Sequence, residues 1–381
     1  MNKTLVAVIV IVLLLIGGWA IYQNQNPAPA SGEPIKIGYI GPLSGDAAVY
    51  GETEKNIIGY AIDDINKNGG ISGQPLEIIY EDGKCNGKDA TTAAQKLISV
   101  DHVQIILGGV CSSETLAAAP IAEKGKVILF SGFSSSPDIA KAGEYIFRNA
   151  PSDADVAKLD AETIAAKYKK VAILSENADY SLGIKNVMKE VFSSKDVQVV
   201  ADENYTGATS DFRSILTKIK SVNPDVLYVN PGSSPKDGGL IAKQARELGI
   251  AAPIHGNFLL GTLDALAAGG DALEGVVISD SIELNADTKN LKTIYKEKFG
   301  TDPAHDLMMG TAYDRVYIIK MALDKVGNDA TKIKDYLNNM GEYKGVIGSY
   351  TFDDNGDLLG QASLFTEVVI KNGQKVPYTG Q

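Results

Sequence analysis

Residues 105–114 read IILGGVCSSE, and residues 127–137 read VILFSGFSSSP. In both stretches a short apolar strand runs directly into serines, which are favoured at the start of a helix. Apolar strands and amphipathic helices alternate on either side, beginning with a strand at 35–40 and a helix at 56–65. This alternation predicts an α/β fold, in which a mostly parallel sheet is covered by helices on both faces.

A second α/β series begins after Pro151. Because 381 residues are more than one hydrophobic core usually holds, the two series predict two lobes. Near the C-terminus, strands at 346–352 and 363–370 precede Asn372-Gly373, a pair typical of a hairpin turn. The strands expected in the second lobe lie at 171–174, 197–201, 226–229, 254–258 and 276–279.

The two serine clusters follow neighbouring strands of the predicted sheet. Helix N-termini carry unpaired N–H groups and partial positive charge, so two of them at the carboxyl ends of parallel strands suit a small anionic group such as a carboxylate. The hydroxyl groups of Ser112 and Ser135 stand at these two positions. The alternative is that each serine only caps its own helix. The repetition on successive strand-helix units favours a small-molecule binder.

The composition excludes several classes of protein. Acidic residues (47) outnumber basic residues (36), and the net charge of -11 argues against nucleic acid and against an anionic membrane surface as partners. The sequence contains no G-x-S-x-G elbow, no P-loop lysine and no H-E-x-x-H motif. We therefore expect no enzyme activity and no cofactor. We expect no metal site either, because the two cysteines and three scattered histidines lack ligand spacing.

Residues 4–22 carry no charge and are long enough to span a bilayer core as a helix. They form either a cleaved signal peptide or an uncleaved signal anchor, and Trp19 and Tyr22 favour the anchor. Residues 23–34 are rich in Asn, Pro, Ala, Ser and Gly, which is typical of a flexible tether. The sequence thus predicts an extracytoplasmic protein, either periplasmic or on the cell surface, that is attached to the membrane through residues 4–22.

Cys85 and Cys111 are the only cysteines of the chain. Both lie near the ends of predicted neighbouring strands. In an exported protein they could form a disulfide that stabilises the fold by about 3 kcal/mol, or they could be two buried thiols.

Several segments together resemble one family, the type I periplasmic solute-binding proteins of branched-chain amino-acid uptake systems, which includes the leucine/isoleucine/valine-binding proteins. The order and spacing of these segments carry the resemblance, which extends from Ile35 to the C-terminus. The matching segments are IGYIGPLSG (37–45) with Tyr50-Gly51, AIDDINKNGGISG (61–73), Cys85, GVCSS (109–113), Ser134–Pro137, Asp179-Tyr180 with Gly183, Ser210–Phe212, Asn223–Asp225 and Tyr313-Asp314.

The resemblance implies two Rossmann-like lobes joined by a three-crossover hinge. Lobe one would comprise residues 35–151 and 281–361, and lobe two residues 152–280 and 362–381. Such a protein is the extracytoplasmic substrate-binding component of an ATP-binding-cassette (ABC) importer, and it delivers its ligand to permease subunits in the membrane. The alternatives are an extracellular ligand sensor that signals to a membrane partner and, in third place, an exported hydrolase.

The resemblance also assigns roles to individual residues. Ser112 and Ser135 would hold the carboxylate of an amino acid or related ligand. The backbone carbonyl of Phe133 would meet its ammonium group, and Tyr50 and Tyr180 would form aromatic walls. The same resemblance pairs Cys85 with Cys111 in a disulfide.

One position departs from the family pattern. Where the family has an acidic side chain for the ligand ammonium, this sequence has Phe258, and a family tyrosine near 231–233 is also missing. An apolar ring cannot replace a carboxylate, and a buried unpaired ammonium is unfavourable by several kcal/mol. Either another acid takes this role, or the ligand is a carboxylate without an amine. The acids considered are Glu176, Asp179 and Glu283.

Overall fold

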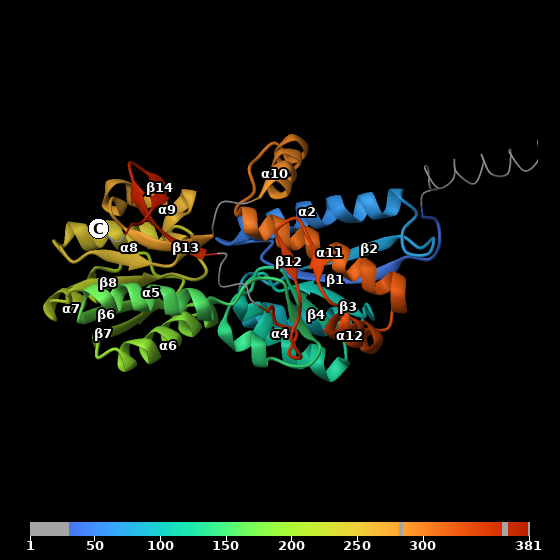
Figure 1. Ribbon diagram of the computed structural model, residues 1–381, viewed down its shortest axis with the longest axis horizontal. Helices are drawn as coiled ribbons and strands as arrows, with labels where there is room; N and C mark the ends of the chain where they lie inside the picture. The colour runs from blue at the N-terminus through green and yellow to red at the C-terminus, as the bar shows by residue number, and fades with distance from the viewer. Residues whose placement is uncertain (1–29, 282–284, 360–364, 380–381) are drawn as a thin grey trace, which may run out of the picture.

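The computed structural model describes residues 30–281, 285–359 and 365–379, and it shows two α/β lobes lying end to end (Figure 1). The described part of the first lobe is built on a five-stranded sheet with the order β2-β1-β3-β4-β5, and that of the second on a seven-stranded sheet with the order β14-β13-β10-β9-β8-β6-β7. The predicted α/β class with mostly parallel sheets is therefore confirmed.

All strand pairs in the first sheet are parallel. Strand β1 shows why this region forms a central strand, since every residue of IKIGYIG except Lys36 is buried. The strands are β1 (Ile35–Gly41), β2 (Leu76–Asp82), β3 (Ile105–Gly108), β4 (Ile128–Ser131) and β5 (Ile146–Arg148), and the helices between them are α2 (Ala48–Lys67), α3 (Gly87–Ser99) and α4 (Ser112–Gly125).

Elements from the C-terminal third of the chain complete the core of the first lobe. Met308 and Ile319 of helix α11 (Asp306–Val326) pack in one cluster with Ile58 and Ile62 of α2. A fully buried ion pair joins the same two helices, with Arg315 Nη2 2.7 Å from Glu54 Oε2. The other late elements are α10 (Ala286–Phe299), α12 (Ala330–Asn339) and the strand pair β11 (Tyr343–Lys344) and β12 (Ser349–Tyr350).

The second sheet is parallel from β7 to β10, whereas β13 and β14 are antiparallel additions at its edge. Asn372 and Gly373 have φ values of 51° and 71°, as the predicted hairpin turn requires. The strands are β6 (Lys170–Glu176), β7 (Gln198–Tyr205), β8 (Val226–Asn230), β9 (Ile254–Gly256), β10 (Val277–Ser281), β13 (Phe365–Lys371) and β14 (Gln374–Pro377). The helices are α5 (Asp153–Lys167), α6 (Asp179–Ser194), α7 (Arg213–Ser221), α8 (Asp237–Glu247) and α9 (Leu263–Gly269).

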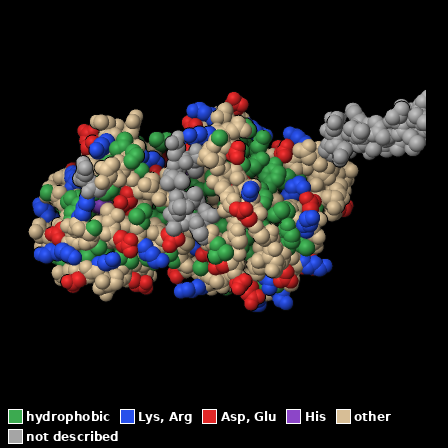
Figure 2. All heavy atoms as spheres, in the orientation of Figure 1, with side chains coloured by type: hydrophobic (Ala, Val, Ile, Leu, Met, Phe, Trp, Pro, Cys, Tyr) green, Lys and Arg blue, Asp and Glu red, His purple; other side chains and the backbone are tan. Residues whose placement is uncertain are grey.

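The chain passes between the lobes three times: after β5, after β10 and before β13. Ser281, the last residue of β10, pairs with Phe365 in the second sheet. Residue 281 therefore still belongs to the second lobe, whereas we expected lobe one to resume there. Charged side chains of both signs are spread over the face of both lobes seen in Figure 2.

Three local predictions need correction. Of the strand expected at 346–352, only Ser349 and Tyr350 form a strand, β12. The second serine cluster does not open an α-helix, because Ser136 caps only a short 3-10 helix, Pro137–Lys141. Phe258 does not end a strand either. Strand β9 stops at Gly256, and the Asn257 side chain accepts a hydrogen bond from the backbone N–H of Leu259, which begins a 3-10 turn, Phe258–Gly261.

The predicted anchor, residues 4–22, lies outside the described residues. Among the residues that are described, no helix has both the length and the apolar character needed to cross a bilayer. The last part of the predicted tether, residues 30–34, is bound to the first lobe, since Ala30 N–H donates to the Asn66 carbonyl and the N–H groups of Ser31 and Gly32 to that of Gly73.

Candidate functional site

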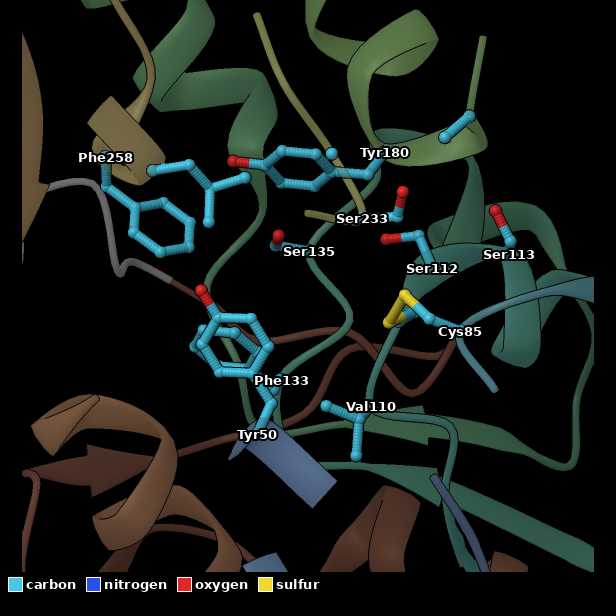
Figure 3. A pocket seen from close by; sticks show the side chains of 14 residues that line it. Tyr50, Cys85, Val110, Ser112, Ser113, Phe133, Ser135, Tyr180, Ser233 and Phe258 are labelled. Atoms are coloured by element: carbon cyan, nitrogen blue, oxygen red, sulfur yellow. A yellow bond between two sulfur atoms is a disulfide. The ribbon is translucent and has the colours of Figure 1, made fainter. Parts of the chain in front are cut away.

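A hollow of about 520 Å³, counting the part open to solvent, lies between the two lobes. The structure brings together there all six residues predicted to bind ligand and both cysteines. Figure 3 shows aromatic rings gathered on one side of the hollow and the hydroxyl groups of Ser112, Ser113 and Ser233 with the disulfide on the other, while Ser135 is seen between the rings. The lining residues are Tyr50, Cys85, Val110, Cys111, Ser112, Ser113, Phe133, Ser135, Ala178, Tyr180, Gly232, Ser233, Phe258 and Leu259.

The start of helix α4 leaves two backbone donors at the pocket. Glu114 accepts hydrogen bonds from the N–H groups of Val110 and Cys111, at 3.0 and 2.9 Å. The N–H groups of Ser112 and Ser113, the first two residues of the helix, have no hydrogen-bond partner among the described residues. Both residues line the pocket. They are the unpaired donors that a helix N-terminus offers to an anion.

Glu114 also fixes the neighbouring loop, because its Oε1 accepts a hydrogen bond of 2.9 Å from the N–H of Cys85. Burial raises the pKa of Glu114 to about 7, although the three backbone hydrogen bonds favour its ionised form. The predicted disulfide between Cys85 and Cys111 is present, with the two Cα atoms 5.2 Å apart. It ties the loop after β2 to the residue that precedes α4.

The three serines of the second cluster have different contacts. Ser134 Oγ bonds back to the Gly109 carbonyl at 2.9 Å, which joins the two strand ends. The N–H of Ser136 donates to Ser112 Oγ at 3.2 Å, so the two clusters contact each other directly. Ser135 lines the pocket, and its N–H has no partner among the described residues. The Ser135 N–H thus joins those of Ser112 and Ser113 as a free donor at the same pocket among the described residues.

Ser135 is held by the first turn of helix α5. Its Oγ donates to Asp153 Oδ2 at 2.6 Å, and its carbonyl accepts from the Asp153 N–H at 2.8 Å. Burial raises the pKa of Asp153 to about 7, opposed by the Ser135 hydrogen bond and the charge of Arg148. While Asp153 is ionised, the Ser135 hydroxyl proton is committed to it. The Ser135 N–H is then the donor that remains for a ligand.

Four aromatic side chains, two from each lobe, line the other side of the pocket. Phe133 contacts an aromatic residue of each lobe. Its ring centroid lies 6.0 Å from that of Tyr50 and 6.0 Å from that of Phe258. Tyr180 at the start of α6 continues the series, 6.4 Å from Phe258. The Tyr50 hydroxyl is buried and unpartnered, and burial raises its pKa well above the usual range, so it keeps its proton and can donate.

None of the acids considered for a ligand ammonium is shown at the pocket wall. Glu176 Oε2 accepts from the N–H groups of Gly232 and Ser233, at 2.8 and 2.7 Å, and Oε1 from the Ser233 hydroxyl. Asp179 is exposed and does not line the pocket. Glu283 lies outside the described residues.

Sequence reasoning did not predict that Gly232 and Ser233 line the pocket. These two residues follow strand β8 just as the two serine clusters follow β3 and β4. The rule that ligands bind at the carboxyl ends of parallel strands, applied to β8 as well, would have indicated them. No group of three or more His, Cys, Asp or Glu side chains within the described ranges is placed to hold a metal ion.

Comparison with known proteins identifies the family. The model of the family described as "Periplasmic binding protein" matches residues 34–374, which is most of the chain. The chain belongs to this family. A curated relative, the leucine-, isoleucine-, valine-, threonine- and alanine-binding protein of Pseudomonas aeruginosa, is 29% identical over 349 residues, which are 91% of each chain. The family is one of binding proteins, in agreement with the expectation that this chain is not an enzyme.

Two solved structures of similar proteins contain different ligands. The branched-chain amino-acid transporter substrate binding protein of Streptococcus pneumoniae, in complex with isoleucine, is 27% identical and has a TM-score of 0.76, covering 90% of this chain and 98% of its own. A solute binding protein of an ABC transporter from Rhodopseudomonas palustris, in complex with 3,4-dihydroxybenzoic acid, is 25% identical with a TM-score of 0.75, covering 90% and 95%. Both ligands carry a carboxyl group, but only isoleucine has an amine.

Proposed function

We propose that this chain is the extracytoplasmic substrate-binding component of an ABC importer, and that it captures a small carboxylate, an amino acid or a related acid, between its two lobes. The observation that carries the proposal is the set of three unpaired backbone N–H groups, of Ser112, Ser113 and Ser135, at one pocket. Its partners would be the ligand and the permease subunits of the importer, and residues 4–22 would attach it to the membrane.

The pocket supports capture by hinge closure. Tyr50 and Phe133 belong to the first lobe, whereas Tyr180 and Phe258 belong to the second, so a ligand contacts both lobes only when they are closed. Such a ligand shifts the population toward the closed state through its additional contacts there. The captured ligand would then be released to the permease when the lobes reopen.

The proposal predicts selective binding of the anionic group. Titration calorimetry with a panel of small carboxylates, each paired with its uncharged carboxamide, should show binding of at least one acid and at least tenfold weaker binding of its amide. The reason is that the free N–H groups form stronger hydrogen bonds with a charged oxygen. If an acid and its amide bind equally, or if no carboxylate binds, the proposal is wrong.

Substitution of Ser112 tests the position of the anion. We expect Ser112→Ala to weaken binding of the same acid about tenfold, because it removes a hydroxyl at the pocket that can donate to the carboxylate, while the backbone N–H stays in place. Hydrogen bonds to charged groups contribute about 1.5–3 kcal/mol. The matched control is Ser194→Ala, at the exposed end of α6, which should leave the affinity unchanged.

A further inference from the structure

We infer that the ligand is an aromatic carboxylate without an amino group. This inference rests on the proposed function and narrows its ligand class. Three features carry it: three unpaired backbone N–H groups and a buried hydroxyl stand at the pocket, no acidic side chain among the described residues lines it, and four aromatic rings form its other side.

The unpaired polar groups match an acceptor, not an ammonium. The N–H groups of Ser112, Ser113 and Ser135 and the buried hydroxyl of Tyr50 all donate hydrogen bonds. The carbonyl of Phe133, which the family resemblance assigns to a ligand amine, is a neutral acceptor and cannot balance a full positive charge. The pocket therefore satisfies a carboxylate and leaves an ammonium without a counter-charge.

Two described acids beside the pocket are already engaged by groups of the protein. Both oxygens of Glu176 accept hydrogen bonds from Gly232 and Ser233, so its carboxylate serves to shape the loop after β8. Asp153 lies behind Ser135, to which it is bonded twice, and it does not line the pocket. Phe258 occupies the wall of the second lobe, where an acid would have to stand to meet an amine in the closed state.

The aromatic side of the pocket favours a planar ring over a branched aliphatic chain. The rings of Phe133 and Phe258 stand edge to face, with an interplanar angle of 78°, and Tyr180 and Phe258 do so at 80°. A ligand ring placed among them would form further offset or edge-to-face pairs, which contribute beyond simple burial of apolar area. Figure 3 shows the hydroxyl groups of Ser112 and Ser113 opposite these rings, so one molecule with a ring and a carboxylate could reach both sides.

The test compares ligands that differ by one group. Calorimetry on the unmodified protein should show 3-phenylpropanoate binding at least tenfold more tightly than phenylalanine, which has the same skeleton with an amine. Tenfold corresponds to about 1.4 kcal/mol. 4-Methylpentanoate should likewise bind more tightly than leucine, and 3-phenylpropanoate more tightly than 4-methylpentanoate.

Exchange of Phe258 should reverse the preference for the amine-free acid. With Phe258→Glu we expect phenylalanine to bind more tightly than 3-phenylpropanoate, because the new carboxylate meets the ammonium. Phe258→Leu, the matched control, keeps an apolar wall and should keep the original order. Thermal unfolding of both variants, with and without ligand, shows that they are folded, and the comparison on the unmodified protein does not depend on them.

The outcomes separate this inference from the proposed function. If phenylalanine or leucine binds as tightly as its amine-free counterpart, or more tightly, the inference is wrong while capture of a carboxylate stands. If 4-methylpentanoate binds more tightly than 3-phenylpropanoate, the preference for an aromatic ring is wrong. If none of the four acids binds, the inference is wrong, and the wider carboxylate panel decides whether the proposed function stands.

Discussion

At the scale of single residues, two carboxylates that do not line the pocket determine which donors are free there. Glu114 pairs the N–H groups of Val110 and Cys111, which leaves those of Ser112 and Ser113 as the free donors. Asp153 accepts the hydroxyl proton of Ser135, which leaves the Ser135 N–H as the free donor. Two acids that repel an anion at long range thus create the surface that binds it at short range.

The raised pKa of Asp153 predicts that binding depends on pH. A bound carboxylate near Ser135 disfavours the ionised form of Asp153 and raises its pKa further above about 7, so binding takes up a proton. The affinity for 3-phenylpropanoate should therefore be higher at pH 6 than at pH 8, and it should fall as the pH rises through the neutral range. Asp153 also interacts electrostatically with other titratable side chains, namely Arg148, Asp160, Tyr180 and Tyr228.

Asp153→Asn is the variant that tests this dependence. The amide keeps a hydrogen bond to Ser135 but does not titrate, so affinity measured by calorimetry should vary several-fold less between pH 6 and pH 8. A variant with the same pH dependence as the unmodified protein would assign the proton to another group, and Glu114 would be the first to examine because its pKa is also about 7.

At the scale of the elements, helix α6 of the second lobe packs directly on the serine cluster of the first. Gly183 is buried there, and a Cβ atom at this position would lie 2.9 Å from Ser136 Oγ and 2.9 Å from Pro137 Cδ. Such contacts are too short, so glycine is what permits the two lobes to approach. Ser136 Oγ also reaches the Asp179 carbonyl at the start of the same helix, at 3.5 Å.

Gly183→Ala should therefore weaken binding without lowering stability. We expect the affinity for 3-phenylpropanoate to fall about tenfold, because the added methyl group opposes closure. The free energy of unfolding should not fall, since Gly→Ala in a helix is usually stabilising by about 0.5–1 kcal/mol.

The matched control is Gly59→Ala in α2, where an added Cβ meets nothing closer than Tyr80 Oη at 3.8 Å. It should leave binding unchanged. Calorimetry gives the affinities and urea unfolding gives the stabilities of both variants. Unchanged affinity in Gly183→Ala would mean that close approach of α6 is not required for binding.

The sequence predicted elements and strand ends better than contacts between them. Ser112 and Ser135 could be placed because apolar strands end just before them, and the family resemblance added Phe133 and Phe258. The bond between Ser135 and Asp153 could not be predicted, because it depends on where α5 begins after the chain enters the second lobe. The loop held by Glu176 likewise joins the ends of β6 and β8, a contact between segments 56 residues apart.

At the scale of the whole molecule, the protein has a net charge of -11 and is nevertheless proposed to bind an anion. Local backbone donors at the end of a sheet must therefore outweigh a field that repels the ligand at long range. The lobes also meet at the rim, where Lys236 Nζ lies 2.9 Å from Asp46 Oδ2 across the gap. This ion pair bridges the two lobes, but an exposed pair contributes little to closure by itself.

The central claim is that the ligand carboxylate sits between the lobes on the free N–H groups of Ser112, Ser113 and Ser135. A crystal structure with the tightest-binding acid of the panel tests it most directly. We predict carboxylate oxygens within about 2.7–3.2 Å of these three nitrogens, with the rest of the ligand among Tyr50, Phe133, Tyr180 and Phe258. Ligand density elsewhere, with these three N–H groups facing only water, would contradict the account.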